Sequence, residues 1–158
     1  MDAGIEVVAT QRLLELGIDL PPVSAPVAAY IPAVASGSQV FTAGQLPFVD
    51  GVLPATGKVG AEVSPEQAAE LARIAALNGV AAAASVAGGV DRIVRVVKVT
   101  VFVASDPSFT GQPAVANGAS QLLQSIFGAR GLHVRSAVGV SVLPLDSPVE
   151  VELVVETR

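Results

Sequence analysis

Three stretches of the chain carry apolar residues at helical spacing. The first covers residues 5–16 and is ended by Gly17, and the last covers residues 112–127 and is ended by Gly128. Prolines concentrate in residues 19–26, which favours an extended linker after the first helix. We therefore expect a short N-terminal helix that an extended segment joins to the rest of the fold.

The middle helix has the clearest start. Ser64 can cap it, Pro65 suits its first position and Gln67 completes a capping box. We expect the helix to run to Gly88. Its larger side chains share one stripe: Leu71, Ile74, Leu77, Asn78, Val80 and Ala81. The opposite side is almost all alanine, so this helix is expected to pack closely on both sides.

The longest strand pattern covers residues 92–104. Every second residue from Ile93 to Val103 is apolar, apart from Arg95, whereas the intervening residues are mixed. This alternation predicts a strand with one face buried under a helix layer and the other facing solvent or a second subunit.

Four shorter segments complete the predicted strands. Residues 30–34 and 39–43 are rich in β-forming residues, and Gly37-Ser38 between them indicates a hairpin turn. Residues 134–143 and 149–155 have similar patterns, and their spacing allows a second antiparallel hairpin.

The order of these elements is α, β, β, α, β, α, β, β. It predicts an α+β sandwich, in which one mixed sheet is covered by two helices on one face. The other face is expected to meet neighbouring subunits. In this division, residues 1–25 form the N-terminal helix and linker, and residues 26–158 form the main domain.

The composition supports an oligomer. The chain has 158 residues, the usual size of one domain, and 51% of them are hydrophobic. A domain of this size has limited interior, so the surplus apolar residues reach the surface and indicate contact with identical subunits.

Charge and residue usage exclude several kinds of site. Nine basic residues face fourteen acidic ones and no Lys/Arg cluster occurs, which argues against nucleic-acid binding. Without cysteine there is no thiolate chemistry, and the single histidine, His133, cannot build a histidine-rich metal site. The start of the chain lacks the features of a signal peptide, and charged residues interrupt each apolar run before it could span a membrane. We expect a cytoplasmic protein.

Arg135 is the strongest candidate for ligand binding. It opens a strand of small or apolar residues, and no acid lies close to it in sequence. Its forked donors need a carboxylate or a phosphate. Two partners remain open: a small carboxylate ligand, or Glu150 or Glu152 on the next strand. Spacing alone favours the salt bridge within the protein.

Five other polar residues have both a structural and a functional interpretation. Glu150 and Glu152 share one strand face, where acids are usually solvated, but at an interface one of them could position a water. Tyr30 fits a packed ring better than a catalytic group. Asn117 fits a surface or capping position on a helix, and His133 fits a half-exposed strand histidine better than a proton-transfer group.

Several segments, in the right order, resemble the RidA/YjgF family of enamine/imine deaminases. Thr42–Pro47 is similar to that family's Thr-Ser-Gly-Gln-Ile-Pro, and Lys98–Val103 to its central strand. Arg135–Ser136, Leu143–Pro144 and Val149–Glu152 resemble its closing hairpin. The resemblance implies a chorismate-mutase-like homotrimer with clefts between its subunits.

The resemblance also implies roles for individual residues. Arg135 corresponds to the arginine that holds the substrate carboxylate, and Glu150 to the acid that orients the hydrolytic water. Tyr30 and Asn117 correspond to residues that line the cleft, Asn117 after a one-residue shift in the alignment.

Ser136 and Ala137, directly after Arg135, belong to the same substrate-binding segment. The chain departs from the family pattern here, because Ala137 replaces a cysteine and Gly139 replaces a glutamate. We therefore expect a roomier and less acidic cleft, and a substrate that differs from the archetypal 2-aminoacrylate.

The activity implied by the resemblance is hydrolysis of small 2-imino or 2-enamino acids to 2-keto acids and ammonia. An imine is already electrophilic, so this reaction needs no metal or organic cofactor. A non-catalytic module that binds a keto acid or a similar small carboxylate is the alternative, since Ala137 and Gly139 alter the site. An endoribonuclease or translation inhibitor, a name attached to the family, is the weakest reading because the chain is acidic.

Overall fold

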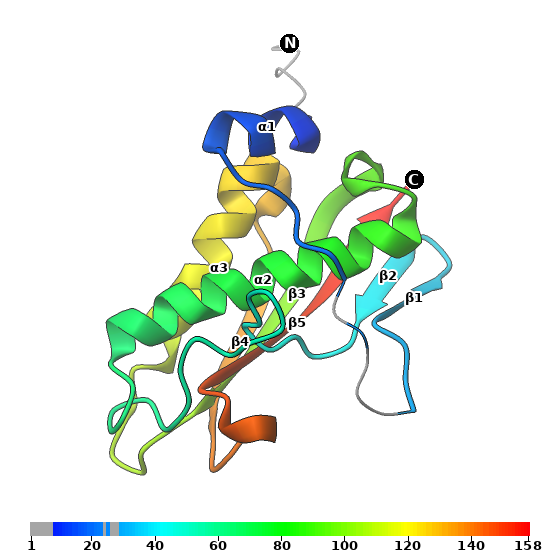
Figure 1. Cartoon of the computed structure of the whole chain (residues 1–158). Helices are drawn as coiled ribbons and strands as arrows, with labels where there is room; N and C mark the ends of the chain where they lie inside the picture. Colours follow the sequence, from blue (N-terminus) through cyan, green and yellow to red (C-terminus); the bar gives the residue numbers. More distant parts are fainter. Residues whose placement is uncertain (1–7, 24, 26–28) are drawn as a thin grey trace.

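The computed structural model describes residues 8–23, 25 and 29–158, with helices packed on one face of a five-stranded sheet (Figure 1). The main elements are α1 (Ala9–Leu16), β1 (Ala33–Ser36), β2 (Gln39–Thr42), α2 (Pro65–Ala87), β3 (Ile93–Ala104), α3 (Gln112–Phe127), β4 (Val134–Val140) and β5 (Val149–Thr157). Short 3-10 helices η1 (Val90–Arg92), η2 (Gly128–Gly131) and η3 (Pro144–Asp146) precede β3, β4 and β5. The strand order β1-β2-β5-β3-β4 makes a mixed sheet, which confirms the predicted α+β sandwich.

α2 begins and ends where the sequence predicts. The Ser64 hydroxyl accepts a hydrogen bond from the backbone N–H of Gln67 at 3.1 Å, and Gly88 ends the helix with a φ of 92°. Small residues dominate its buried side: Ala68, Ala72, Ala75, Ala76, Gly79, Ala82 and Ala83. Ile74 and Leu77, from the predicted apolar stripe, are only partly buried. Small side chains therefore set the close contact of α2 with its neighbours.

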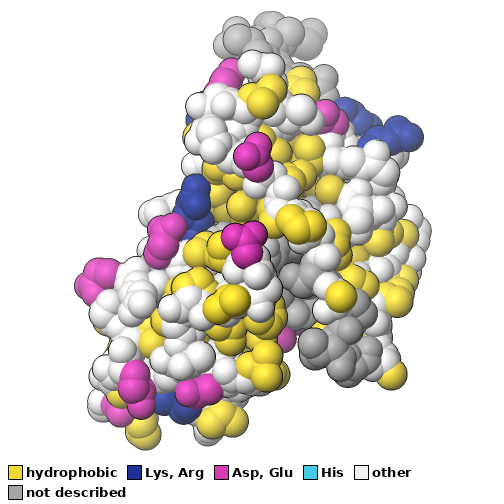
Figure 2. All heavy atoms as spheres, in the orientation of Figure 1, with side chains coloured by type: hydrophobic (Ala, Val, Ile, Leu, Met, Phe, Trp, Pro, Cys, Tyr) yellow, Lys and Arg dark blue, Asp and Glu magenta, His cyan; other side chains and the backbone are white. Residues whose placement is uncertain are grey.

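The apolar character of α2 follows from its central position. Among the described residues it alone has the length and mean hydropathy of a membrane span, but 61% of that stretch is buried within the fold. Figure 2 shows the surface on this side of the molecule, with apolar side chains across it and Lys and Arg scattered rather than gathered.

β3 alternates as predicted only in its second half. From Val99 to Val103 every second side chain is fully buried. Before Lys98 the register against β5 shifts twice. Because of these irregularities, the residues before Lys98 project to the face opposite to the one that strict alternation predicts. Val96 is therefore buried and Arg95 is exposed. Strict alternation over the whole run was therefore wrong.

The predicted hairpin between the last two strands is also wrong. β3 lies between β4 and β5, parallel to β4 and antiparallel to β5. The connection from Val140 to Val149 passes β3 and turns through Leu145 and Asp146, which both have a φ of 58°. A short connection can join two strands that pair with each other, or two strands that lie on either side of a third. The spacing of the two segments therefore did not distinguish a hairpin from the observed arrangement.

The first hairpin is confirmed, with a later start to its first strand. β1 and β2 pair antiparallel around a turn in which Gly37 has a φ of 61°. β1 begins at Ala33, and Tyr30 lies in a bend before it. Pro32 explains the difference, because proline has no N–H to donate to a strand ladder.

α1 packs against the main domain and is fixed at its start by η1. The Thr10 backbone N–H and hydroxyl donate to the Asp91 carboxylate at 2.9 and 2.6 Å. Leu13 is buried in the common core, and Gly17 ends the helix as predicted. Residues 5–7 of the expected helix lie outside the described residues.

The crossing of α2 and α3 gives a test of this packing. A Cβ on Gly118 would overlap the backbone carbonyl of Ala69. We expect Gly118→Ala to lower the free energy of unfolding by about 2 kcal/mol, because this clash outweighs the gain of roughly 1 kcal/mol in helix propensity. Urea unfolding measures the change. Gln124→Ala, exposed on the same helix, should stay within about 0.5 kcal/mol of wild type. A Gly118→Ala protein as stable as wild type would contradict the close crossing.

Candidate functional site

Arg135 lies near the start of β4, on the side of the sheet that the helices cover. It pairs with Val99 of β3, which is buried under the helices, and paired residues project to the same face. Its Nη1 donates to Oδ1 of Asn117 at 2.8 Å and to Oγ of Ser120 at 3.2 Å, both on α3. Both hydrogens of Nη1 are thus committed. The Nε–Nη2 edge of the guanidinium has no hydrogen-bond partner within the described part of the chain.

Ser120 and His133 support this guanidinium. Nδ1 of His133 donates to the Gly131 carbonyl at 2.6 Å, and its Nε2 makes a hydrogen bond with the Ser120 hydroxyl at 2.9 Å. The Ser120 oxygen in turn accepts from Arg135. Ser120 is only 6% exposed, so its hydroxyl is turned to these two partners and is not presented as a nucleophile.

Sequence reasoning missed Ser120. The sequence held one signal for the hydrogen bonds around Arg135: His133 lies two residues before it. This spacing places the two side chains on the same side of the sheet. The facing helix residue depends on how α3 sits on β4, and no local pattern encodes that.

Glu150 lies on the open face of the sheet, against Gly44. A Cβ on Gly44 would overlap Oε1 of Glu150, so the carboxylate occupies space that any larger residue would fill. Gln45 exchanges backbone hydrogen bonds with Val151 at 2.7 and 3.0 Å, which holds this segment along β5. Burial raises the pKa of the Glu150 carboxyl above its ordinary value, and the charge of Glu152 adds to the rise. The Thr42–Pro47 motif therefore shapes the surroundings of this acid.

Arg135 and Glu150 face opposite sides of the sheet. On β3, Arg135 pairs with Val99 and Glu150 pairs with Phe102, with no register shift between them. Side chains alternate along a strand, so residues three positions apart project to different faces. Glu152 shares the face of Glu150. The salt bridge from Arg135 to either acid, favoured by spacing, is therefore wrong.

The other expected site residues are divided between the two faces. Ala137 follows Arg135 on the helix side, whereas Ser136 projects to the open face. Asn117 joins Arg135 through its hydrogen bond, instead of serving as a cap. Tyr30 is 47% exposed rather than a packed ring, and it precedes β1 at the edge of the sheet farthest from β4. Within the chain, Arg135, Asn117 and Ala137 lie together, whereas Tyr30, Ser136 and Glu150 do not join them.

The expected extra room beside Gly139 is already filled. A Cβ there would lie 2.9 Å from Nε2 of Gln112 and 3.2 Å from Oγ of Ser105. Gln112 is held in place by hydrogen bonds to that Ser105 hydroxyl and to the Phe109 carbonyl. The prediction of a roomier cleft is wrong at this position, and the group that fills it is an uncharged amide.

The two clusters offer different chemistry. The Nε–Nη2 edge of Arg135 presents two parallel donors that match a carboxylate. Glu150, with its raised pKa, is a proton acceptor that is poised closer to neutral pH than an ordinary glutamate. Among the described residues, no group of three or more His, Cys, Asp or Glu is placed to hold a metal ion.

Comparison with known proteins assigns this chain to a family. Residues 10–157 match the family described as "YjgF/chorismate_mutase-like, putative endoribonuclease". Protein TCP17 of Trypanosoma cruzi is 45% identical over 157 residues, which cover 96% of this chain and 98% of that protein.

Solved structures of related proteins have the same fold. Atu1372 of Agrobacterium tumefaciens, whose function is unknown, has a TM-score of 0.87 at 39% identity, covering 96% of this chain and 93% of that one. TdcF of E. coli, solved with bound serine, has a TM-score of 0.62 at 26% identity, covering 88% and 94%. The expected chorismate mutase-like fold is confirmed, and this chain belongs to the YjgF/chorismate mutase-like family.

Proposed function

We propose that this protein hydrolyses small 2-imino or 2-enamino acids to 2-keto acids and ammonia, in clefts between the subunits of a homotrimer. The observation that carries the proposal is the Nε–Nη2 edge of Arg135, which a substrate carboxylate can take as two parallel hydrogen bonds. The relative TdcF, solved with bound serine, supports a ligand of this kind, since serine carries such a carboxylate.

The proposed hydrolysis uses the guanidinium of Arg135 and the carboxylate of Glu150. Protonation of the enamine at carbon, with loss of a proton from its nitrogen, gives the imine, and Arg135 fixes its reactive carbon through the carboxylate. A water then adds to that carbon while Glu150 accepts its proton and the imine nitrogen gains one. The carbinolamine loses its C–N bond, releasing ammonia and leaving the keto acid. Water supplies the oxygen, and no oxidant or reductant is consumed.

A cleft between subunits is needed because one chain separates these groups. Arg135 and Glu150 lie on opposite faces of the sheet, and Tyr30 precedes the far edge strand. The open face exposes large apolar side chains: Val34 by 48%, Phe41 by 40%, Val134 by 65% and Val138 by 43%. Exposed apolar surface of this extent favours burial against another copy of the chain. Such packing would bring the β4 edge of one subunit to the open face of the next.

Binding without turnover is the second candidate. The Arg135 cluster, with Asn117 and Ser120, is complete within one chain, whereas Glu150 is remote from it. A keto acid could therefore be held at Arg135 without any contribution from Glu150.

Replacement of Arg135 tests the carboxylate contact. Arg135→Lys keeps the charge but removes the forked edge, so we expect kcat/KM for imine hydrolysis to fall about 100-fold. Imino acids generated in situ by an amino-acid oxidase provide the substrate, and keto-acid and ammonia release are followed. Arg95→Lys, exposed on β3, is the matched control and should keep full activity.

If wild type accelerates no imine yet binds keto acids by calorimetry, the binding module is correct. RNA cleavage that requires Arg135 would favour the ribonuclease.

The acid limb of the pH profile tests Glu150. A general base acts as the carboxylate, so activity falls as the pH drops through its raised pKa. Glu152→Gln removes the like charge that contributes to the rise, and we expect the acid limb of kcat/KM to move to lower pH. Glu156→Gln, further along β5, should leave the limb in place. A limb that does not respond to Glu152→Gln would argue against Glu150 as the base.

Ser120 is predicted to position Arg135. We expect Ser120→Ala to raise KM about threefold to tenfold with a smaller change in kcat, because one hydrogen bond to the guanidinium is lost while its charge remains. Ser125→Ala, on the same helix, is the control. A purely structural role would instead reduce the active fraction and leave KM unchanged, and that outcome would refute the positioning role.

A further inference from the structure

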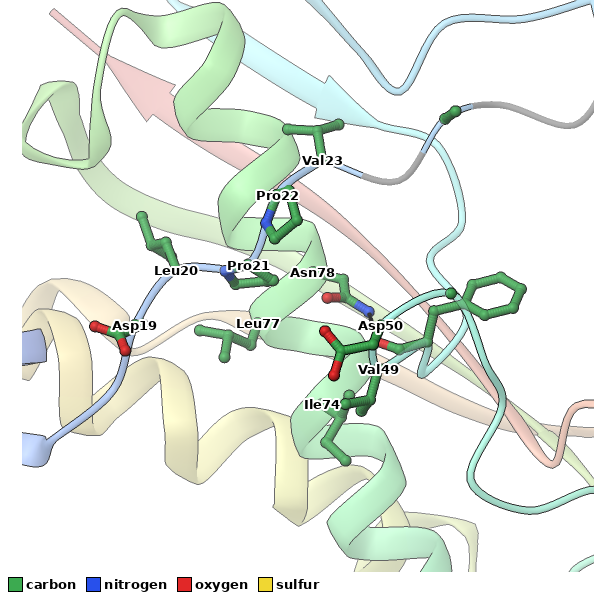
Figure 3. A pocket seen from close by; sticks show the side chains of 13 residues that line it. Asp19, Leu20, Pro21, Pro22, Val23, Val49, Asp50, Ile74, Leu77 and Asn78 are labelled. Carbon is green, nitrogen blue, oxygen red and sulfur yellow. Dashed lines mark hydrogen bonds between the residues drawn. The ribbon is translucent and has the colours of Figure 1, made fainter.

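A cavity outside the Arg135 and Glu150 clusters lies between the linker, α2 and the loop after β2 (Figure 3). Its volume is about 570 Å³, within the range of small-molecule sites. Leu20–Val23 form one wall, Ile74 and Leu77 of α2 another, and Val49–Gly51 the third. The cavity thus uses the larger α2 side chains that the core contact leaves partly exposed.

Asn78 provides a polar side chain in the wall of this cavity. The residue is 5% exposed, and its Nδ2 donates to the carbonyls of Leu46 and Phe48 at 3.0 and 3.1 Å. Its Oδ1 accepts no hydrogen bond from any residue that the structure describes. Figure 3 shows the nitrogen turned to the loop and the oxygen on the side of Pro21. Among the described residues no buried side-chain oxygen or nitrogen lacks a partner, so this oxygen is open to the cavity, where a ligand can donate a hydrogen bond to it.

The remaining polar side chains of the cavity are acids. Asp19 and Asp50 line it, and no Lys, Arg or His stands among the described lining residues. Proline, which forms part of the linker wall, has no N–H. Among the lining residues that the structure describes, Nδ2 of Asn78 is the one side-chain donor, and it is already committed. The cavity therefore accepts hydrogen bonds and favours positive charge, beside walls that are mainly apolar.

We propose that this cavity binds a small primary amine in its ammonium form. The ammonium donates to Oδ1 of Asn78 and to the Asp50 carboxylate, and an apolar body of several carbons packs against Pro21, Ile74 and Leu77. This chemistry is opposite to that of Arg135, which takes an anion. The site stands independently of the proposed hydrolysis, since it shares no residue with either cluster.

Titration of the full-length protein with hexylammonium, followed by NMR, tests the proposal. We expect a saturable shift of the Asn78 side-chain amide and of the backbone amides of Val49–Gly51. Hexanoate and hexan-1-ol, of the same chain length, should bind at least tenfold more weakly, on the order of one lost charged contact. If the three probes bind equally, or hexylammonium shifts only residues elsewhere, the proposal is overturned.

Two variants sharpen the test. Asp50 has a φ of 51°, which asparagine tolerates, so Asp50→Asn keeps the turn while removing the charge. We expect it to weaken hexylammonium binding about threefold to fivefold, whereas Glu70→Gln, exposed on α2 outside the cavity, has no effect. Leu77→Lys places a cation in the cavity and should abolish binding, with Leu14→Lys, 69% exposed on α1, as control. Unchanged binding in both cavity variants would refute the site.

Discussion

β3 bonds to β4 on one side and to β5 on the other, and its second half lies directly under the helix layer. This double pairing fixes the register of both neighbours at once. Arg135 is set opposite Val99, and Glu150 opposite Phe102. Since a slip of one residue would turn the buried valines to the open face, the hydrophobic effect holds this register firmly. The separation of the two charged groups onto different faces is thus a consequence of how the core is built.

The helix layer depends on small residues in the same way. Gly79 on α2 lies so close to Leu153 of β5 that a Cβ would approach its Cδ1 to 2.9 Å. Gly118 brings α3 closer still to α2, since a Cβ there would overlap the backbone carbonyl of Ala69. Close contact on the inner side leaves Ile74 and Leu77 on the outer side of α2, where the linker covers them in part. The N-terminal segment therefore completes an apolar surface that the main domain leaves open, and creates a cavity in doing so.

The surroundings of Arg135 show how a charged group is held at a partly buried position. A guanidinium beside a packed core needs acceptors for its donors, and Asn117 and Ser120 supply them without adding negative charge. His133 continues the hydrogen-bond chain to a backbone carbonyl. Because no acid in the described chain neutralises Arg135, its positive charge stays available to a ligand.

Several features could be predicted from the amino-acid sequence: the start and end of α2, the bounds of α3, the alternation from Val99 to Val103 and, through the order of its motifs, the family. The sequence did not determine the order of the strands, the irregular start of β3, the neighbours of Arg135 or the contact of Gly44 with Glu150. The reason is the range of the interactions. Caps, turns and alternation involve residues a few positions apart, whereas strand order and helix placement depend on which distant surfaces bury the most apolar area together, and only the folded chain decides that.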